Sequence, residues 1–195
     1  MNSKIEEMRL KLVKELDESR YQHTLGVMYT AAAMAMRYVE DVEKALIAGL
    51  LHDCAKCIPG TMKISLCEQN SIEISDIERQ NTGLLHAKLG VYVARAEYGV
   101  EDKDILMSIK SHTTGRPDMS LLEKIIYIAD FMEPGRKELP NMADVRKLAF
   151  EDIDKCLFRI LKDSLVYLKS RDYAVDPMTE ETYEFYKAIM EGEHA

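Results

Sequence analysis

The chain has 195 residues and a formal net charge of −8 at pH 7; 47% of its residues are hydrophobic and 31% are charged. This composition is typical of a single globular domain, because a chain of this length buries most of its unfolded surface without help from disulfides. The acidic balance excludes a general nucleic-acid-binding surface, and no run approaches the ~18 apolar residues of a membrane span.

Apolar residues three and four positions apart predict helices in the first half of the chain. Ile5, Met8 and Leu12 share one face of the first helix, and Asp41 stands where the N-cap of a later helix belongs. Residues 67–82 are mostly polar and predict a loop with at most one short helical turn. The predicted helices cover 1–18, 21–38, 41–50 and 60–66. Residues 1–18 are too charged for a signal peptide, so we expect the protein in the cytoplasm.

The second half of the chain is also predicted to be helical. Gly99 separates two amphipathic segments, and Ser120 with Glu123 forms a capping box that opens the next apolar run. The sequence shows no convincing period-two alternation, hairpin dipeptide or internal repeat. It therefore predicts an all-α domain, and the helices in this half cover 84–98, 102–111, 121–132, 151–169 and 179–190.

Two carboxylates stand at the ends of apolar runs. Asp53 follows Leu50, Leu51 and His52, and Asp130 follows the run from 125 to 129. Such a carboxylate is pulled towards the core, where an unpaired charge costs several kcal/mol or neutralises through a shifted pKa. Both positions therefore predict a nearby cation.

Four histidines fall on four different predicted helices or helix ends: His23, His52, His86 and His112. Taken alone, each is more often an ordinary core or surface residue than a ligand. Together with Asp53 and Asp130 they follow the order H…HD…H…H…D, and imidazoles with carboxylates form a donor set that suits iron, manganese or zinc. The pattern favours a buried metal centre.

The pair Cys54-x-x-Cys57 allows a different interpretation, as a redox motif or a zinc site. A structural zinc site needs a second pair of ligands, which Cys67 and Cys156 do not form. A thioredoxin-like motif needs a strand–helix setting, and no strand is predicted here. We therefore prefer the metal centre built from histidine and aspartate.

Four segments carry a resemblance to a known family: RYQHTLGV, LLHDCAKCIPG, HAKLGVYVA and HTTGRPDMSLLEKIIYIADFMEPGR. The order of His23, His52–Asp53 and Asp130 resembles that of the HD-domain metal-dependent phosphohydrolases. Over about residues 11–184 the chain is similar to the YqeK family of symmetrical dinucleoside-tetraphosphate hydrolases.

The resemblance implies an all-helical bundle that forms a single HD domain over residues 1–195. Its core would span about 18–137, with C-terminal helices at 141–190 packing on it. It also implies an enzyme that binds iron and cleaves diadenosine tetraphosphate in the middle to give two ADP, as a homodimer.

The resemblance further implies which residues form the site. The metal ligands would be His23, His52, Asp53 and Asp130. His86 and His112 would either hold a second metal that shares Asp53 or contact phosphate directly, and the sequence leaves both roles open. The residues that the resemblance places near nucleotide are Arg20, Asp53, Lys56, His86, His112, Thr113 and Arg136. Arg116 is added for its charge after a turn of small residues, with plain solvent exposure as the alternative. Tyr173 and Pro177 lie in a segment whose default interpretation is an ordinary interhelical loop, and the alternative is that they flank an adenosine.

The chemistry expected of this set is hydrolysis at phosphorus. A bound metal lowers the pKa of a water ligand, and two metals ~3.5–4 Å apart would also hold the phosphoryl oxygens. Lys56, Arg116 and Arg136 each follow a ligand-bearing helix and supply the local positive charge that phosphate requires. We expect Asp53, Lys56 and Arg136 to act in catalysis.

Two other functions are compatible with these residues. An HD-domain nucleotidase acting on mononucleotides or another signalling nucleotide would use the same site. A helical nucleotide-binding or scaffold module would dispense with catalysis, but the intact ligand set argues against it.

Overall fold

The computed structural model describes residues 3–171 and 174–192, which form helices and loops without a strand. The predicted all-α fold is therefore confirmed. The helices are α1 (Ser3–Leu12), α2 (Glu18–Tyr38), α3 (Val42–Leu51), α4 (Gly60–Gln69), α5 (Asp76–Gln80), α6 (Leu85–Tyr98), α7 (Lys103–Ser111), α8 (Leu121–Met132), α9 (Met142–Glu151), α10 (Ile153–Ser170) and α11 (Pro177–Glu191). None of the described helices is long and apolar enough to cross a membrane.

Two helix boundaries differ from the prediction because of N-caps. The first helix ends at Leu12 rather than at 18, since the Asp17 side chain accepts a hydrogen bond from the Arg20 amide and starts α2. Asp152 likewise caps α10 through the Lys155 amide and separates it from α9. The patterns described above do not predict α9, whose N-cap residue Asn141 makes no side-chain capping bond.

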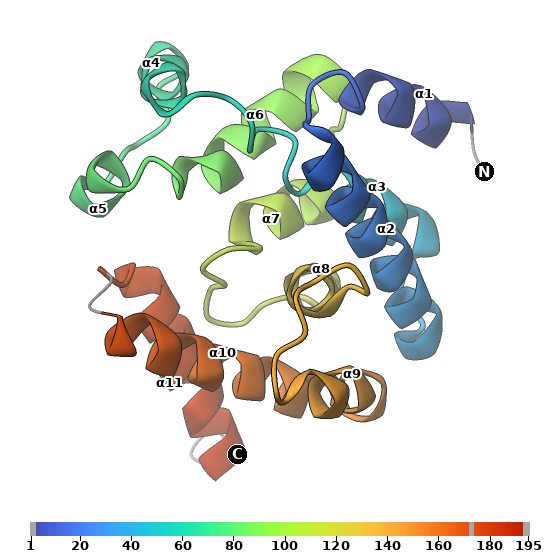
Figure 1. Ribbon diagram of the computed structural model, residues 1–195, viewed down its shortest axis with the longest axis vertical. Helices are drawn as coiled ribbons and strands as arrows, with labels where there is room; N and C mark the ends of the chain where they lie inside the picture. The colour runs from blue at the N-terminus through green and yellow to red at the C-terminus, as the bar shows by residue number, and fades with distance from the viewer. Residues whose placement is uncertain (1–2, 172–173, 193–195) are drawn as a thin grey trace.

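Helix α8 is the centre of the molecule. It contacts α2, α3 and α7 on one side and α9 and α10 on the other, and Figure 1 shows it between the N-terminal and C-terminal helices. Ile125, Ile126, Ile128 and Ala129 are fully buried, so this helix is apolar around most of its circumference. Asp130, in its last turn, is thereby held inside the bundle.

Helices α2 and α3 lie very close together. A Cβ on Gly49 would come within 2.8 Å of the Met28 backbone, so only glycine fits at this crossing. The close approach brings His23, near the start of α2, beside His52, which directly follows α3. The rings of these two histidines lie 5.4 Å apart, centre to centre.

Candidate metal centre

Six side chains from five helices or helix ends converge on one buried centre. The ligand atoms of His23, His52 and Asp130 lie within 4.8 Å of one another, and the same holds for His52, Asp53 and His112. His86 joins this second group, with its Nε2 3.2 Å from Asp53 Oδ1. The structure thus brings together every residue that the sequence predicted as a metal ligand or alternative ligand.

The two carboxylate oxygens of Asp53 face different parts of the centre. Oδ2 lies 3.6 Å from His52 Nε2 and 3.9 Å from His23 Nε2. Oδ1 lies 3.2 Å from His86 Nε2 and 3.5 Å from His112 Nε2. Asp53 is therefore placed between two groups of donors.

All four imidazoles have the same tautomer imposed on them. Three Nδ1 atoms donate to the backbone carbonyl three residues earlier: His52 to Gly49 at 2.7 Å, His86 to Gly83 at 2.5 Å and His112 to Ile109 at 2.7 Å. A carbonyl can only accept, so Nδ1 carries the proton in each of these rings. In a neutral ring the Nε2 lone pair then points into the centre, which is how a protein orients a histidine ligand.

Two of these histidines lie in identical tetrapeptides. Gly49-Leu50-Leu51-His52 ends α3, and Gly83-Leu84-Leu85-His86 begins α6. In both, the histidine Nδ1 binds the glycine carbonyl. The same four-residue unit thus orients two of the imidazoles.

The centre contains buried acceptors without partners. His23 Nε2, His52 Nε2 and Asp53 Oδ1 are buried and accept no well-directed hydrogen bond from the described residues. The Nε2 atoms of His86 and His112 are only 3.0 Å apart. Leaving one such group unpaired costs about 1–3 kcal/mol, so several together require a cation among them. Imidazole nitrogens and carboxylate oxygens fit a divalent transition metal.

The protonation states of these side chains at neutral pH are also those that a metal requires. Burial lowers the pKa of His52 to about 4 and that of His86 to about 4, so both rings are neutral. Burial by itself would raise the pKa of Asp53, but the neighbouring imidazoles, His52 first, outweigh burial once they are protonated at low pH, and they hold that pKa well below the usual value. The pKa of Asp130 is lowered in the same way, by His23 first. The two carboxylates are therefore ionised, and the neutral rings of His52 and His86 are free to bind a metal.

Four of the residues that the sequence analysis expects near nucleotide surround the centre. Arg20 Nη1 lies 2.8 Å from Asp53 Oδ2, and Lys56 Nζ lies 3.1 Å from His86 Nε2. Arg136 donates to the carboxylate of Asp130 and, over 2.7 Å, to its backbone carbonyl. Thr113 Oγ1 is 3.2 Å from the Nε2 atoms of both His86 and His112.

The remaining predicted nucleotide contacts lie farther out. The Arg116 guanidinium makes two hydrogen bonds of 2.7 and 2.6 Å to the buried carboxylate of Glu123. Arg116 and Pro177 line a cavity of about 760 Å³ beside α5, α6 and α7. Tyr173 lies outside the described residues.

Glu133 is a site residue that the sequence prediction missed. This buried carboxylate accepts from His23 Nδ1 at 3.0 Å and from the Gly135 amide at 2.5 Å, so it orients His23 as the carbonyls orient the other rings. Gly26 makes room for it, since a Cβ there would lie 2.2 Å from Glu133 Oε2. The available signal was an acid directly before Pro134-Gly135, where an apolar helix ends.

Two connected cavities open from the centre towards α10 and α11. The first, of about 410 Å³, is lined by Lys56, His112, Thr113 and Arg136, among others. The second, of about 590 Å³, lies beyond it and shares Thr113 and Tyr127 with the first. A ligand with a phosphate at the centre can therefore extend between these helices.

The chain is similar in sequence to a known family and to known proteins. A model of the HD domain family matches residues 20–135. The chain is 41% identical to the symmetrical bis(5'-nucleosyl)-tetraphosphatase of Bacillus subtilis, over 87% of this chain and 90% of that protein. It is 42% identical to the protein of the same name from Halalkalibacterium halodurans, over 89% of this chain and 92% of that protein.

A solved structure supports the same assignment. It is the crystal structure of an HD superfamily hydrolase from Clostridium acetobutylicum, described as involved in NAD metabolism. The two structures superpose with a TM-score of 0.91 and 42% sequence identity, over 94% of this chain and 97% of that one. The chain belongs to the HD domain family and, within it, to the symmetrical bis(5'-nucleosyl)-tetraphosphatases.

Proposed function

We propose that this chain is a metal-dependent phosphohydrolase that cleaves diadenosine tetraphosphate symmetrically to two ADP. The observation that carries the proposal is the convergence of oriented imidazole nitrogens and two ionised carboxylates on one buried centre, with cations at its rim. The family assignment selects the substrate among those that this chemistry could act on.

The donor set supports a divalent metal, for which we propose iron; manganese and zinc accept the same ligands. His23, His52, Asp53 and Asp130 would hold one ion. The position of Asp53 between two groups of donors favours a second ion held by Asp53, His86 and His112. When bound, the metal lowers the pKa of a water ligand and polarises the phosphoryl oxygens.

The protein's own cations act on the phosphate chain. Hydrolysis adds water across the anhydride between the two inner phosphates, and negative charge spreads over the equatorial oxygens in the transition state. Arg20, Lys56 and Arg136 carry N–H groups at the rim of the centre and would stabilise that charge. We also propose that the Thr113 hydroxyl donates a hydrogen bond to a phosphate oxygen.

One nucleoside would lie in the cavities between α8, α10 and α11. The outer cavity is lined by Tyr127, Ser164, Leu168 and Asp176, a mixture of apolar surface and hydrogen-bonding groups typical of a nucleoside site. Pro177 lines the neighbouring cavity of about 760 Å³ and not this one, so its contact with an adenosine stays a prediction.

Two further points rest on the family resemblance and the sequence. We propose that the protein is a homodimer, which light scattering on the purified protein tests, and that it resides in the cytoplasm, which fractionation tests.

The central experiment measures hydrolysis of diadenosine tetraphosphate by protein purified without chelator and supplied with ferrous iron. We expect ADP as the sole product, and loss of activity in Asp53→Ala. Asp104→Ala is the matched control, because that carboxylate pairs with Lys44 on the surface. AMP plus ATP would place the cut at an outer phosphorus, and turnover of mononucleotides alone would favour the nucleotidase.

A further inference from the structure

A groove of about 1020 Å³ begins at His23 of the metal centre and lies between α2 and α9. One wall is a single face of α2, which Gln22, His23, Gly26, Thr30 and Ala33 share. Over this stretch the helix rises about 17 Å, at 1.5 Å per residue. The other wall is the segment from Met132 to Lys137 together with α9. We call this the distal groove.

The charge of the distal groove is opposite to that of the whole chain. Arg20, Arg136, Lys137 and Arg146 line it, and Glu133 is its only carboxylate. Glu133 is already bound by His23 and the Gly135 amide, so it offers little to a ligand cation. Arg20, Arg136 and Arg146 are paired with Asp53, Asp130 and Glu138, so the unpaired positive charge of the groove is that of Lys137. In a chain with a net charge of −8, this charge points to an anionic ligand.

Lys137 is the cation best placed to bind such a ligand. Its side chain is exposed and forms no hydrogen bond or ion pair within residues 3–171 and 174–192. Arg146 is held differently: it donates to the carbonyls of Met132 at 3.0 Å and Glu133 at 3.3 Å and so fixes the end of α8. The groove therefore combines one free ammonium with a fixed wall.

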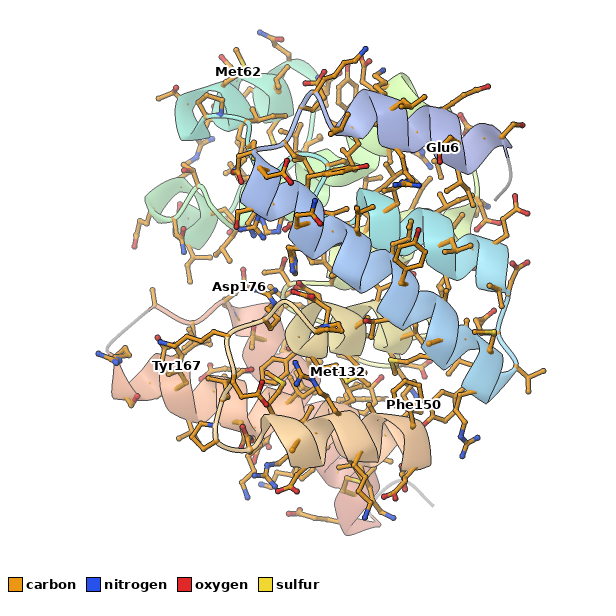
Figure 2. All side chains as sticks on the ribbon, turned by 45° about the vertical axis from the view of Figure 1, so that its right-hand side comes forward. Glu6, Met62, Met132, Phe150, Tyr167 and Asp176 are labelled. Carbon is orange, nitrogen blue, oxygen red and sulfur yellow. The ribbon has the colours of Figure 1, made fainter. Side chains whose placement is uncertain are left out.

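The distal groove also contains two exposed aromatic side chains. Tyr29 is 53% exposed and Phe150 is 37% exposed, and both line it. Figure 2 shows Phe150 at the end of α9, beside α2. Exposed aromatic rings next to cations are the combination by which proteins bind a nucleoside and its phosphates, through stacking and charge pairing.

A symmetrical cut requires a binding site for each of the two halves of the substrate. A cut at the central anhydride leaves a nucleoside diphosphate on each side of the metal centre, and the cavities towards α10 and α11 accommodate one of them. Arg136 and Lys137 line both the distal groove and the cavity of about 410 Å³, so these two cations stand between the two spaces. In Figure 2, Met132 lies between Asp176 on the one side and Phe150 on the other.

We propose that the distal groove binds the second nucleoside diphosphate of the substrate, with Tyr29 and Phe150 against the base and Lys137 on its phosphates. This inference rests on the proposed function, because it assigns the second half of the same substrate.

The test compares two substrates that differ only in the second nucleoside. Diadenosine tetraphosphate and adenosine 5'-tetraphosphate carry the same four phosphates, and the ratio of their kcat/KM values measures what the second adenosine contributes. We expect wild-type protein to prefer the dinucleotide and Tyr29→Ala or Phe150→Ala to lower that preference roughly tenfold, as the loss of one stacked base does. Tyr167→Ala is the matched control: Tyr167 is 54% exposed on α10, away from the groove in Figure 2, and its loss should leave the ratio unchanged.

A second measurement separates this inference from the proposed function. Calorimetric titration of the metal-loaded protein with ADP should reveal a weaker second site that Tyr29→Ala and Lys137→Ala remove, whereas Lys162→Ala, at another exposed lysine, retains it. An unchanged substrate ratio in the groove variants, or a single ADP per wild-type chain, would overturn the inference. If the wild-type protein hydrolyses neither substrate, the proposed function fails, and the ADP titration still decides whether the groove binds nucleotide.

Discussion

Glu133→Gln is the change that tests most directly how the centre is built. The carboxylate accepts one hydrogen bond on each oxygen, from His23 Nδ1 at 3.0 Å and from the Gly135 amide at 2.5 Å. Glutamine has the same shape but only one acceptor oxygen. Whichever way its amide is turned, an NH₂ group meets an N–H donor, and one of the two hydrogen bonds is lost.

The magnitude follows from that loss. A hydrogen bond to a charged group contributes about 1.5–3 kcal/mol, and the free energy of unfolding of the metal-free protein should fall by that amount. For a chain of this length the melting temperature should fall by roughly 2–4 °C per kcal/mol. Because His23 loses its orienting partner, metal affinity should drop about 10–100-fold, as for other residues that hold a metal ligand in place.

The assay is a competition titration of metal against a chelator, together with thermal melting of the metal-free protein. Glu138→Gln is the matched control, because Glu138 lies in the same segment with its side chain 70% exposed. Gly26→Ala should reproduce the effect, since its Cβ would displace the Glu133 carboxylate, and the double variant should be no worse than the stronger single one. Wild-type metal affinity in Glu133→Gln would refute the reasoning.

Three more predictions concern pH, the metal and the Arg116 pair. In the folded protein the pKa values of His52 and His86 are about 4, below the 6.5 of an exposed histidine. The unfolded chain therefore takes up protons first, and the metal-free protein should lose stability as the pH falls from 6.5 to 4. Equal urea midpoints at pH 7 and pH 5 would contradict this. Chelator should abolish hydrolysis and lower the melting temperature, with a free-energy loss of about 2.7 kcal/mol for a metal held at 100 times its Kd, and ferrous iron should restore both. Arg116→Ala should cost roughly 2–3 kcal/mol of stability because it leaves the buried Glu123 carboxylate unpaired, less than a fully buried pair would since Arg116 is partly exposed; a urea titration in which Arg116→Ala matches wild type would show that the pair contributes nothing.

The sequence predicts the ligands of the centre better than their supports. His52 and Asp53 end an apolar run, and Asp130 does the same, so local burial already implies that they meet a cation. The partner of His23 is 110 positions away, at Glu133, and no periodic pattern connects the two. Contacts of that kind depend on how α2 lies across α8, which only the assembled fold determines.

The helices follow the same rule. Helices α3 and α8, whose N-caps Asp41 and Ser120 can be recognised in the sequence, start where the sequence predicts, whereas the N-caps Asp17 and Asp152 were not recognised. The helix α9 lacks a side-chain cap, and its apolar residues Met142, Val145 and Ala149 reach the core only because α8 and α10 lie beside it. The distal groove is not visible in the sequence for the same reason, since its walls come from α2 and α9.

The local hydrogen bonds of the histidines have a consequence for metal preference. His52, His86 and His112 are each held by a carbonyl three residues earlier, so the direction of these rings is decided within one helical turn. The spacing between the rings, in contrast, is decided by how the helices pack. Substitutions in the surrounding core should therefore alter the size of ion that fits best while these three rings keep their direction. The protein would then exchange one transition metal for another before it lost the ability to bind any.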